Sequence, residues 1–268
     1  MIRDLAARIR GRLRRLFRGP PPFLFSGVYA RWADAQQASG GYSAATILEK
    51  ARIATRKVVS GEAAFERDTV LFREPEPDET KLRGLSRAAS ANGGRLSVVD
   101  FGGALGSAYH QNRQYLVAPG GLRWSVVEQP HFVSCGQQEF QTETLRFYKS
   151  LEACIDQEQP NVALLSGVLS YLEFPLDVLR HLARRSLPFI LIDRTAIAAD
   201  GKTRLSVQRV APEIYDASYP CWIFSRQAII DALGPKYELI EDFESGIDGA
   251  ADCDWGRVEF YGMFFRLL

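Results

Sequence analysis

The chain has 268 residues, 46% of them hydrophobic and 24% charged, and carries a formal net charge of +1 at pH 7. A charge so close to zero argues against a dedicated nucleic-acid-binding protein, and no apolar run has the length of a membrane span. The length fits either one large α/β domain with additions or two small domains. We expect one domain with a helical extension.

The first 20 residues contain seven arginines and one aspartate, and their apolar side chains recur at steps of three and four. This spacing predicts a basic amphipathic segment over residues 1–22, broken by the prolines at its end. It fits either a terminal helix docked on the domain or a peripheral contact of residues 1–20 with an anionic membrane. Because the continuous apolar core of a secretory signal is missing, we expect a cytoplasmic protein. If it associates with the membrane, we expect it on the inner face.

Residues 23–94 are predicted to form a mostly helical cap. One helix is expected after Ser43, and a second is expected to begin after Asp78 and to stop at Gly93 and Gly94. Between the two helices, the charged residues 66–68 are expected to be either solvated or part of the edge of a lid, and solvation is the simpler interpretation.

From residue 95 to 268 short apolar runs alternate with helix-like segments, a pattern that is typical of successive βα units. Helix-like segments separate the first five predicted strands, and two further strands end the chain. The seven predicted strands lie at 96–101, 123–128, 145–149, 162–167, 189–193, 236–243 and 258–267. The expected fold is therefore Rossmann-like α/β, with a seven-stranded, mostly parallel sheet and an antiparallel final strand.

The first predicted strand ends at Asp100 and is followed by Gly102, Gly103 and Gly106. Glycine lacks a Cβ, so the backbone can take positive φ and approach a nucleotide-like ligand at the carboxyl edge of the sheet. The spacing does not fit the nicotinamide fingerprint G-x-G-x-x-G, although an NAD-dependent oxidoreductase stays an alternative. A purely structural turn is the other alternative.

The pattern acid-x-Gly-x-x-x-Gly resembles motif I of the class I methyltransferases, which bind S-adenosylmethionine. Asp100, Gly102 and Gly106 match that motif, whereas Ala104 stands where the family has its middle glycine. Glu128 ends the second predicted strand, where a carboxylate can accept hydrogen bonds from both ribose hydroxyls of a nucleoside.

Several longer segments resemble one family of bacterial methyltransferases that is often associated with surface-polysaccharide gene clusters. They include "DFGGALGSAYHQNRQYL", "WSVVEQPHFV", "LLSGVLSYLEFPLDVL" and "GEAAFERDTVLF", and the likeness covers roughly residues 26–245. The resemblance implies an enzyme that transfers a methyl group from S-adenosylmethionine to a small-molecule or glycan acceptor, in particular to an oxygen of a sugar or glycolipid precursor. A non-catalytic, nucleoside-binding or scaffold module of polysaccharide assembly is a further alternative.

The same resemblance implies a set of cofactor-binding residues at the ends of the first four strands. They are Asp100, Gly102, Gly103, Ala104, Gly106, Glu128, Gln129, Ser150, Leu151, Ser166, Gly167 and Val168. Ser150 and Leu151 would lie near adenine, and residues 166–168 would pass under the amino-acid tail.

Methyl transfer to a hydroxyl needs a base at this edge of the sheet. The candidate catalytic residues are His110, His131, Tyr171 and Asp193. Asp193 precedes Arg194, so it could act as a base, orient a histidine or form an ion pair with that arginine. The scattered cysteines and histidines have no metal-ligand spacing, and we expect no metal.

Overall fold

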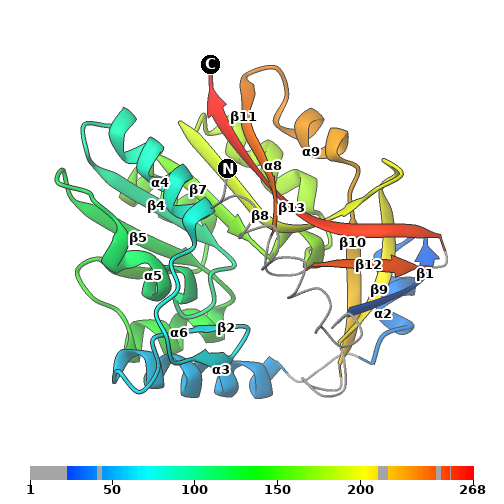
Figure 1. Cartoon of the computed structure of the whole chain (residues 1–268), viewed down its shortest axis with the longest axis horizontal. Helices are drawn as coiled ribbons and strands as arrows, with labels where there is room; N and C mark the ends of the chain where they lie inside the picture. The colour runs from blue at the N-terminus through cyan, green and yellow to red at the C-terminus, as the bar shows by residue number, and fades with distance from the viewer. Residues whose placement is uncertain (1–22, 41–43, 211–216, 246–248, 254) are drawn as a thin grey trace, which may run out of the picture.

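A computed structural model describes residues 23–40, 44–210, 217–245, 249–253 and 255–268 (Figure 1). The predicted basic segment at residues 1–22 and the predicted helix cap Ser43 lie outside these ranges. None of the helices in the described ranges combines the length and the hydropathy needed to cross a bilayer.

The core of the molecule is one large sheet in the strand order β11-β13-β8-β7-β4-β5-β6. Its parallel strands are β4 (Leu96–Phe101), β5 (Leu122–Val127), β6 (Leu145–Tyr148), β7 (Val162–Ser166) and β8 (Phe189–Ala198). The final strand, β13 (Gly256–Leu267), runs antiparallel to its neighbours β8 and β11 (Tyr237–Glu244). The predicted Rossmann-like fold with an antiparallel final strand is thus confirmed. The sheet has eight strands, because β12 (Ala250–Cys253) folds back onto β13.

Alternating side chains of these strands serve two separate hydrophobic layers. Val98 points into a layer that contains α4 (Glu79–Ala91), α5 (Ser107–Asn112) and α6 (Pro130–Glu139). Val99 points into the opposite layer, with α7 (Leu151–Glu158), α8 (Pro175–Arg184) and α9 (Arg226–Leu233). Both faces of the sheet are therefore buried, which explains why its strands are apolar runs in the sequence.

A second, three-stranded antiparallel sheet lies beside the large one (Figure 1). It consists of β1 (Phe23–Tyr29), β9 (Arg204–Val210) and β10 (Ser218–Ile223), and α2 (Trp32–Gln37) packs on it. The sequence pattern does not predict this small sheet, and no strand is expected between residues 194 and 220. Part of that segment continues β8 to Ala198, five residues beyond the predicted end of the strand.

The predicted cap at residues 23–94 contains helices, as expected, but also three strands. Besides β1 and α2 it holds α3 (Ala44–Val59) and the hairpin of β2 (Phe65–Arg67) and β3 (Val70–Phe72). Its last helix, α4, begins at the N-cap Asp78, as predicted, and belongs to the helical layer of the large sheet. The helix after the glycine-rich turn is short: α5 is followed by the 3₁₀ turn η1 (Arg113–Tyr115).

Candidate functional site

Residues 102–106, called the glycine loop below, connect β4 to α5. Three of them have left-handed backbone: Gly102 at φ +75°, Ala104 at φ +51° and Gly106 at φ +92°. This conformation costs an L-residue with a Cβ about 1–2 kcal/mol, and Ala104 adopts it where the methyltransferase motif has glycine. The loop therefore takes a left-handed turn at Ala104 despite the Cβ of this residue.

The glycine loop lies in tight contact with its surroundings. A Cβ added to Gly102 would lie 2.4 Å from Cγ2 of Val168, and one added to Gly103 would lie 2.5 Å from the carboxyl carbon of Asp100. No side chain fits at either position without displacing a neighbour. Glycine at these two positions is therefore required by the packing of the loop against Val168 and Asp100, at the carboxyl edge of the sheet.

Asp100 lies beneath this loop. Its side chain is almost fully buried, and Oδ2 accepts a hydrogen bond of 2.9 Å from Nε1 of Trp124. Burial raises the pKa of Asp100 to about 6, although the Trp124 N–H and the charge of Lys81 act in the opposite direction. The carboxyl group therefore supports the loop from below.

The raised pKa predicts a specific dependence of stability on pH. The folded chain holds the Asp100 proton more tightly than the unfolded chain, so the free energy of unfolding should fall as the pH rises from about 4 to 6. Asp100→Asn should lack this contribution and gain about 2–3 kcal/mol relative to the wild type over that interval. Urea unfolding of both proteins at a series of pH values measures it, and a difference independent of pH would contradict the assignment.

Glu128 follows β5 at the same edge and is half-buried. Its Oε2 accepts a 2.7 Å hydrogen bond from the backbone N–H of Gln129, and the carboxylate also accepts one from the N–H of Ala104. Burial raises the pKa of Glu128, whereas these two hydrogen bonds and the neighbouring His131 lower it. The residue therefore joins the end of the second strand to the glycine loop.

The two candidate histidines have different surroundings. Burial, together with Arg113, lowers the pKa of His110 to about 4, so its imidazole is neutral at physiological pH. Within the described ranges neither of its ring nitrogens has a hydrogen-bond partner. His131 packs against Phe132, with ring centroids 5.0 Å apart. Neither residue hydrogen-bonds to Asp193 in the described part of the chain.

Asp193 forms an ion pair, but not with its neighbour Arg194. Nζ of Lys81 lies 2.6 Å from Oδ2 of Asp193 and 2.5 Å from Oδ2 of Asp78, and all three side chains are buried. The Oγ of Ser166 donates a weaker bond of 3.3 Å to Asp193. The possible pair with Arg194 is thus wrong: Arg194 has φ +52° at an irregularity in the register of β8, and its side chain reaches another partner.

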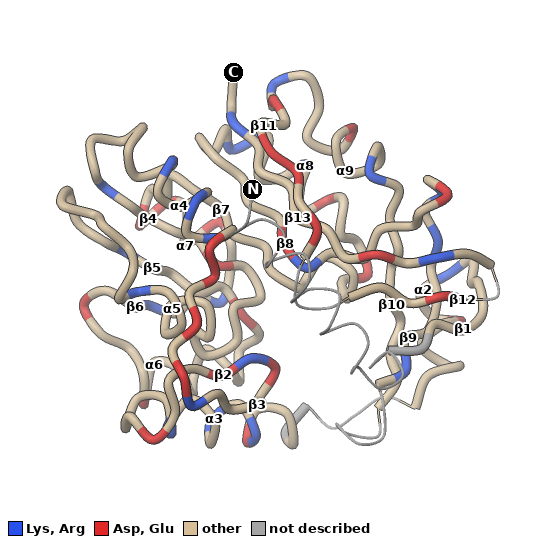
Figure 2. The backbone as a smooth tube through the Cα atoms, in the orientation of Figure 1, with Lys and Arg blue, Asp and Glu red and all other residues tan. Residues whose placement is uncertain are grey.

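Arg194 instead reaches the hairpin β2–β3, where its Nη2 lies 2.7 Å from Oδ2 of Asp68. On the same hairpin Glu66 is buried and accepts hydrogen bonds from the hydroxyl of Ser107 and from the backbone N–H of Thr69. The hairpin carries both basic and acidic residues (Figure 2). The interpretation of Glu66 as a solvated charge is therefore wrong.

Tyr171 lies in the 3₁₀ turn η2 (Leu169–Tyr171) that follows β7, and it contacts the small sheet. Its hydroxyl donates a 3.0 Å hydrogen bond to Oε1 of the fully buried Gln208, and its ring packs edge-on against Tyr219 at 5.2 Å. Tyr219 and Gln208 face each other across β10 and β9. The small sheet is thus anchored next to the carboxyl end of β7.

The other predicted cofactor residues lie in the loops that follow their strands. Ser150 caps α7 by accepting a 3.1 Å hydrogen bond from the N–H of Ala153, and Leu151 is buried in the layer below. Gly167 has φ +66°, and an added Cβ would contact the Arg194 side chain at 3.7 Å. Gln129 is exposed at the start of α6.

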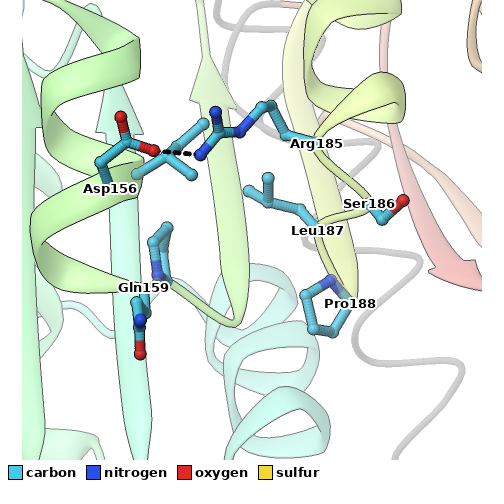
Figure 3. Close-up of a pocket in the computed structure, with 8 residues that line it drawn as sticks. Asp156, Gln159, Arg185, Ser186, Leu187 and Pro188 are labelled. Carbon is cyan, nitrogen blue, oxygen red and sulfur yellow. Dashed lines mark hydrogen bonds and ion pairs between the residues drawn. The ribbon is translucent and has the colours of Figure 1, made fainter.

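Two cavities lie away from the glycine loop. One of about 290 Å³ is formed where α7 and α8 end, and Asp156 and Arg185 form an ion pair across it (Figure 3). It lies at the amino ends of β7 and β8, the opposite edge of the sheet. A second, of about 190 Å³, is lined by Phe174 and Trp222 among others. Among the described residues, no group of three histidine, cysteine or acidic side chains is arranged to hold a metal ion.

No protein-family model matches the chain, and no curated protein matches it. Solved structures similar to it include several methyltransferases complexed with S-adenosylmethionine (SAM) or S-adenosylhomocysteine (SAH). The N-terminal domain of EvdMO1, in the presence of SAH and D-fucose, shares 14% identity at a TM-score of 0.49, over 81% of this chain and 97% of that chain.

Two further neighbours have similar statistics. The glycopeptide N-methyltransferase MtfA, complexed with SAM, shares 9% identity at a TM-score of 0.47, over 69% of this chain and 94% of that chain. The Burkholderia thailandensis 1,6-didemethyltoxoflavin-N1-methyltransferase shares 16% identity at a TM-score of 0.41, over 90% of this chain and 92% of that chain. At such identities the likeness concerns the fold alone.

Proposed function

We propose that this chain is a SAM-dependent methyltransferase that methylates an oxygen of a sugar or glycolipid precursor of a bacterial surface polysaccharide. The observation that carries the proposal is the glycine loop, which is left-handed at Gly102, packs too closely on Val168 and Asp100 for a Cβ at Gly102 or Gly103, and donates a hydrogen bond to the Glu128 carboxylate. Bare backbone beside a carboxylate at the carboxyl edge suits a nucleoside with a charged tail.

In this proposal, residues at the ends of three strands each bind a different part of the cofactor. Glu128 accepts hydrogen bonds from the ribose hydroxyls, Ser150 and Leu151 contact the adenine, and residues 166–168 support the amino-acid tail. Asp100 acts from beneath, because its buried carboxyl group fixes the loop above it. When bound, SAM supplies a sulfonium-bound methyl group.

The protein's remaining tasks are to align the acceptor for in-line displacement and to remove its proton. Asp193 is paired with Lys81, and the Tyr171 hydroxyl donates a hydrogen bond to Gln208. In this proposal both side chains are fixed by these partners and line the site without acting as the base. His110 and His131 are then the candidate bases. His110 is neutral above about pH 4, but the burial that lowers its pKa also makes it a weak base.

Calorimetry with S-adenosylhomocysteine, the demethylated product, tests the proposal. The wild type is expected to bind it, and to release no heat with NAD. Glu128→Gln should bind roughly ten- to a hundredfold more weakly, because charged hydrogen bonds to the ribose are lost. The exposed Glu143→Gln, which changes the charge equally just before β6 at the opposite edge of the sheet, should bind like the wild type. Absence of heat in the wild type would refute the proposal.

The proposal also places the protein in the cytoplasm, with the basic residues 1–20 on the anionic inner face of the membrane. Deleting residues 1–20 is expected to abolish co-sedimentation with anionic liposomes while it leaves binding of S-adenosylhomocysteine unchanged. Equal co-sedimentation of the two proteins would remove the membrane contact from the proposal without affecting its chemistry.

A further inference from the structure

The hairpin β2–β3 lies across the point where the order of the large sheet reverses. The chain passes from β4 to β5 on one side, whereas β7 lies on the other side of β4. Open α/β sheets bind ligands at such a point. Glu66 of the hairpin is bonded to Ser107, directly after the glycine loop, and Asp68 is paired with Arg194, whose side chain lies beside Gly167. The hairpin is therefore bonded to the start of α5, which follows β4, and to β8, on either side of this point.

Glu66 is a buried carboxylate without a cationic partner among the described residues. Only 5% of its surface is exposed, and its hydrogen bonds come from a hydroxyl and a backbone N–H, the latter at 2.9 Å. Arg194 is near enough to influence it, but pairs with Asp68. Burial raises the pKa of Glu66, although its two hydrogen bonds and the charge of Arg194 act in the opposite direction, so the carboxylate is costly in the absence of a direct cationic partner.

The direction in which the cofactor runs follows from the proposed function, on which this inference rests. Glu128 at the end of β5 marks the nucleoside end. Because neighbouring strands lie about 4.8 Å apart, β7 is roughly 10 Å from β5, on the far side of the glycine loop. The amino-acid end of the cofactor therefore points toward β7 and the hairpin.

We propose that Glu66 binds the α-ammonium group of the cofactor's amino-acid end. Ser107 and the N–H of Thr69 orient its carboxylate, and the Asp68–Arg194 ion pair holds the hairpin in place. The hairpin is then a specificity element, since it distinguishes an adenosyl amino acid from a nucleoside with an uncharged tail. Glu66 is a binding residue in this scheme and takes no part in proton transfer.

The experiment compares two ligands that differ only at this group, on the full-length protein. Calorimetry measures the affinity for S-adenosylhomocysteine and for its analogue without the α-amino group. The wild type is expected to prefer S-adenosylhomocysteine by tenfold or more, and Glu66→Gln to bind both ligands with the same, weaker affinity. Glu62→Gln removes an exposed carboxylate four residues earlier and should keep the wild-type preference.

Each other outcome has a distinct meaning. If Glu66→Gln keeps the preference, or the wild type has none, the inference is overturned while the proposed function stands. If the wild type binds neither ligand, the proposed function itself fails. Should Glu66→Gln not fold, Glu66→Asp keeps the charge and replaces it in the comparison: a reduced but measurable preference supports the inference, and an unchanged one overturns it.

Discussion

Replacing Lys81 with methionine is expected to destabilise the fold by about 3–5 kcal/mol, because two buried carboxylates would lose their shared cation. Although burial lowers the pKa of Lys81, Asp193 and Asp78 raise it above its ordinary value. The loss is a large fraction of the 5–15 kcal/mol that typically separates folded and unfolded states. Urea unfolding at neutral pH measures it.

The control for this experiment is Lys236→Met, which removes an exposed lysine and should change the free energy of unfolding by less than about 0.5 kcal/mol. Adding Asp78→Asn and Asp193→Asn to Lys81→Met should restore part of the lost stability, since the uncompensated charges are removed as well. A loss below about 1 kcal/mol for Lys81→Met would contradict the buried arrangement of Lys81, Asp78 and Asp193.

Gly102→Ala is expected to cost about 2–5 kcal/mol, the sum of a left-handed alanine and an overpacked contact. Its Cβ would lie 2.4 Å from Cγ2 of Val168 at φ +75°. The same change moves the backbone under the proposed cofactor, so binding of S-adenosylhomocysteine should fall at least tenfold. Urea unfolding and calorimetry measure the two effects separately.

A double-mutant cycle separates the two causes. Val168→Ala removes both methyl groups that the new Cβ would meet. The double mutant Gly102→Ala, Val168→Ala should therefore lose less stability than the sum of the losses of the two single mutants. The part that is not recovered is the cost of the backbone conformation together with the remaining contact with Cβ of residue 168, at 2.9 Å. Strict additivity would show that Val168 does not press on the loop.

The parts of the fold that the sequence predicts well are those with a local signal. The large sheet has apolar strands buried on both faces, and its helices show caps and periodicity within a few residues of each boundary. The glycine loop is of the same kind, because Asp100 and the glycines lie within seven positions. The small sheet has no such signal: the hydroxyl of Ser206 reaches the carbonyl of Ser26, which is 180 residues away.

The candidate site divides in the same way. Gly102, Gly106 and Glu128 follow from strand ends, which place them at one edge. Lys81 was missed, since a lysine on an amphipathic helix normally faces solvent. Glu66 was interpreted as solvated for the same reason. Only the fold brings their partners Asp193 and Ser107 to them, so composition or periodicity cannot show that these charges are buried.

The pairing of β1 with β9 has a consequence for biosynthesis. β1 emerges from the ribosome long before β9, which at ordinary rates of translation follows after roughly 10–40 s. Throughout that interval the backbone groups of β1 have no strand to bind. A nascent chain with such an open edge is prone to aggregation, so its yield in the cell should depend on chaperones that bind newly made segments.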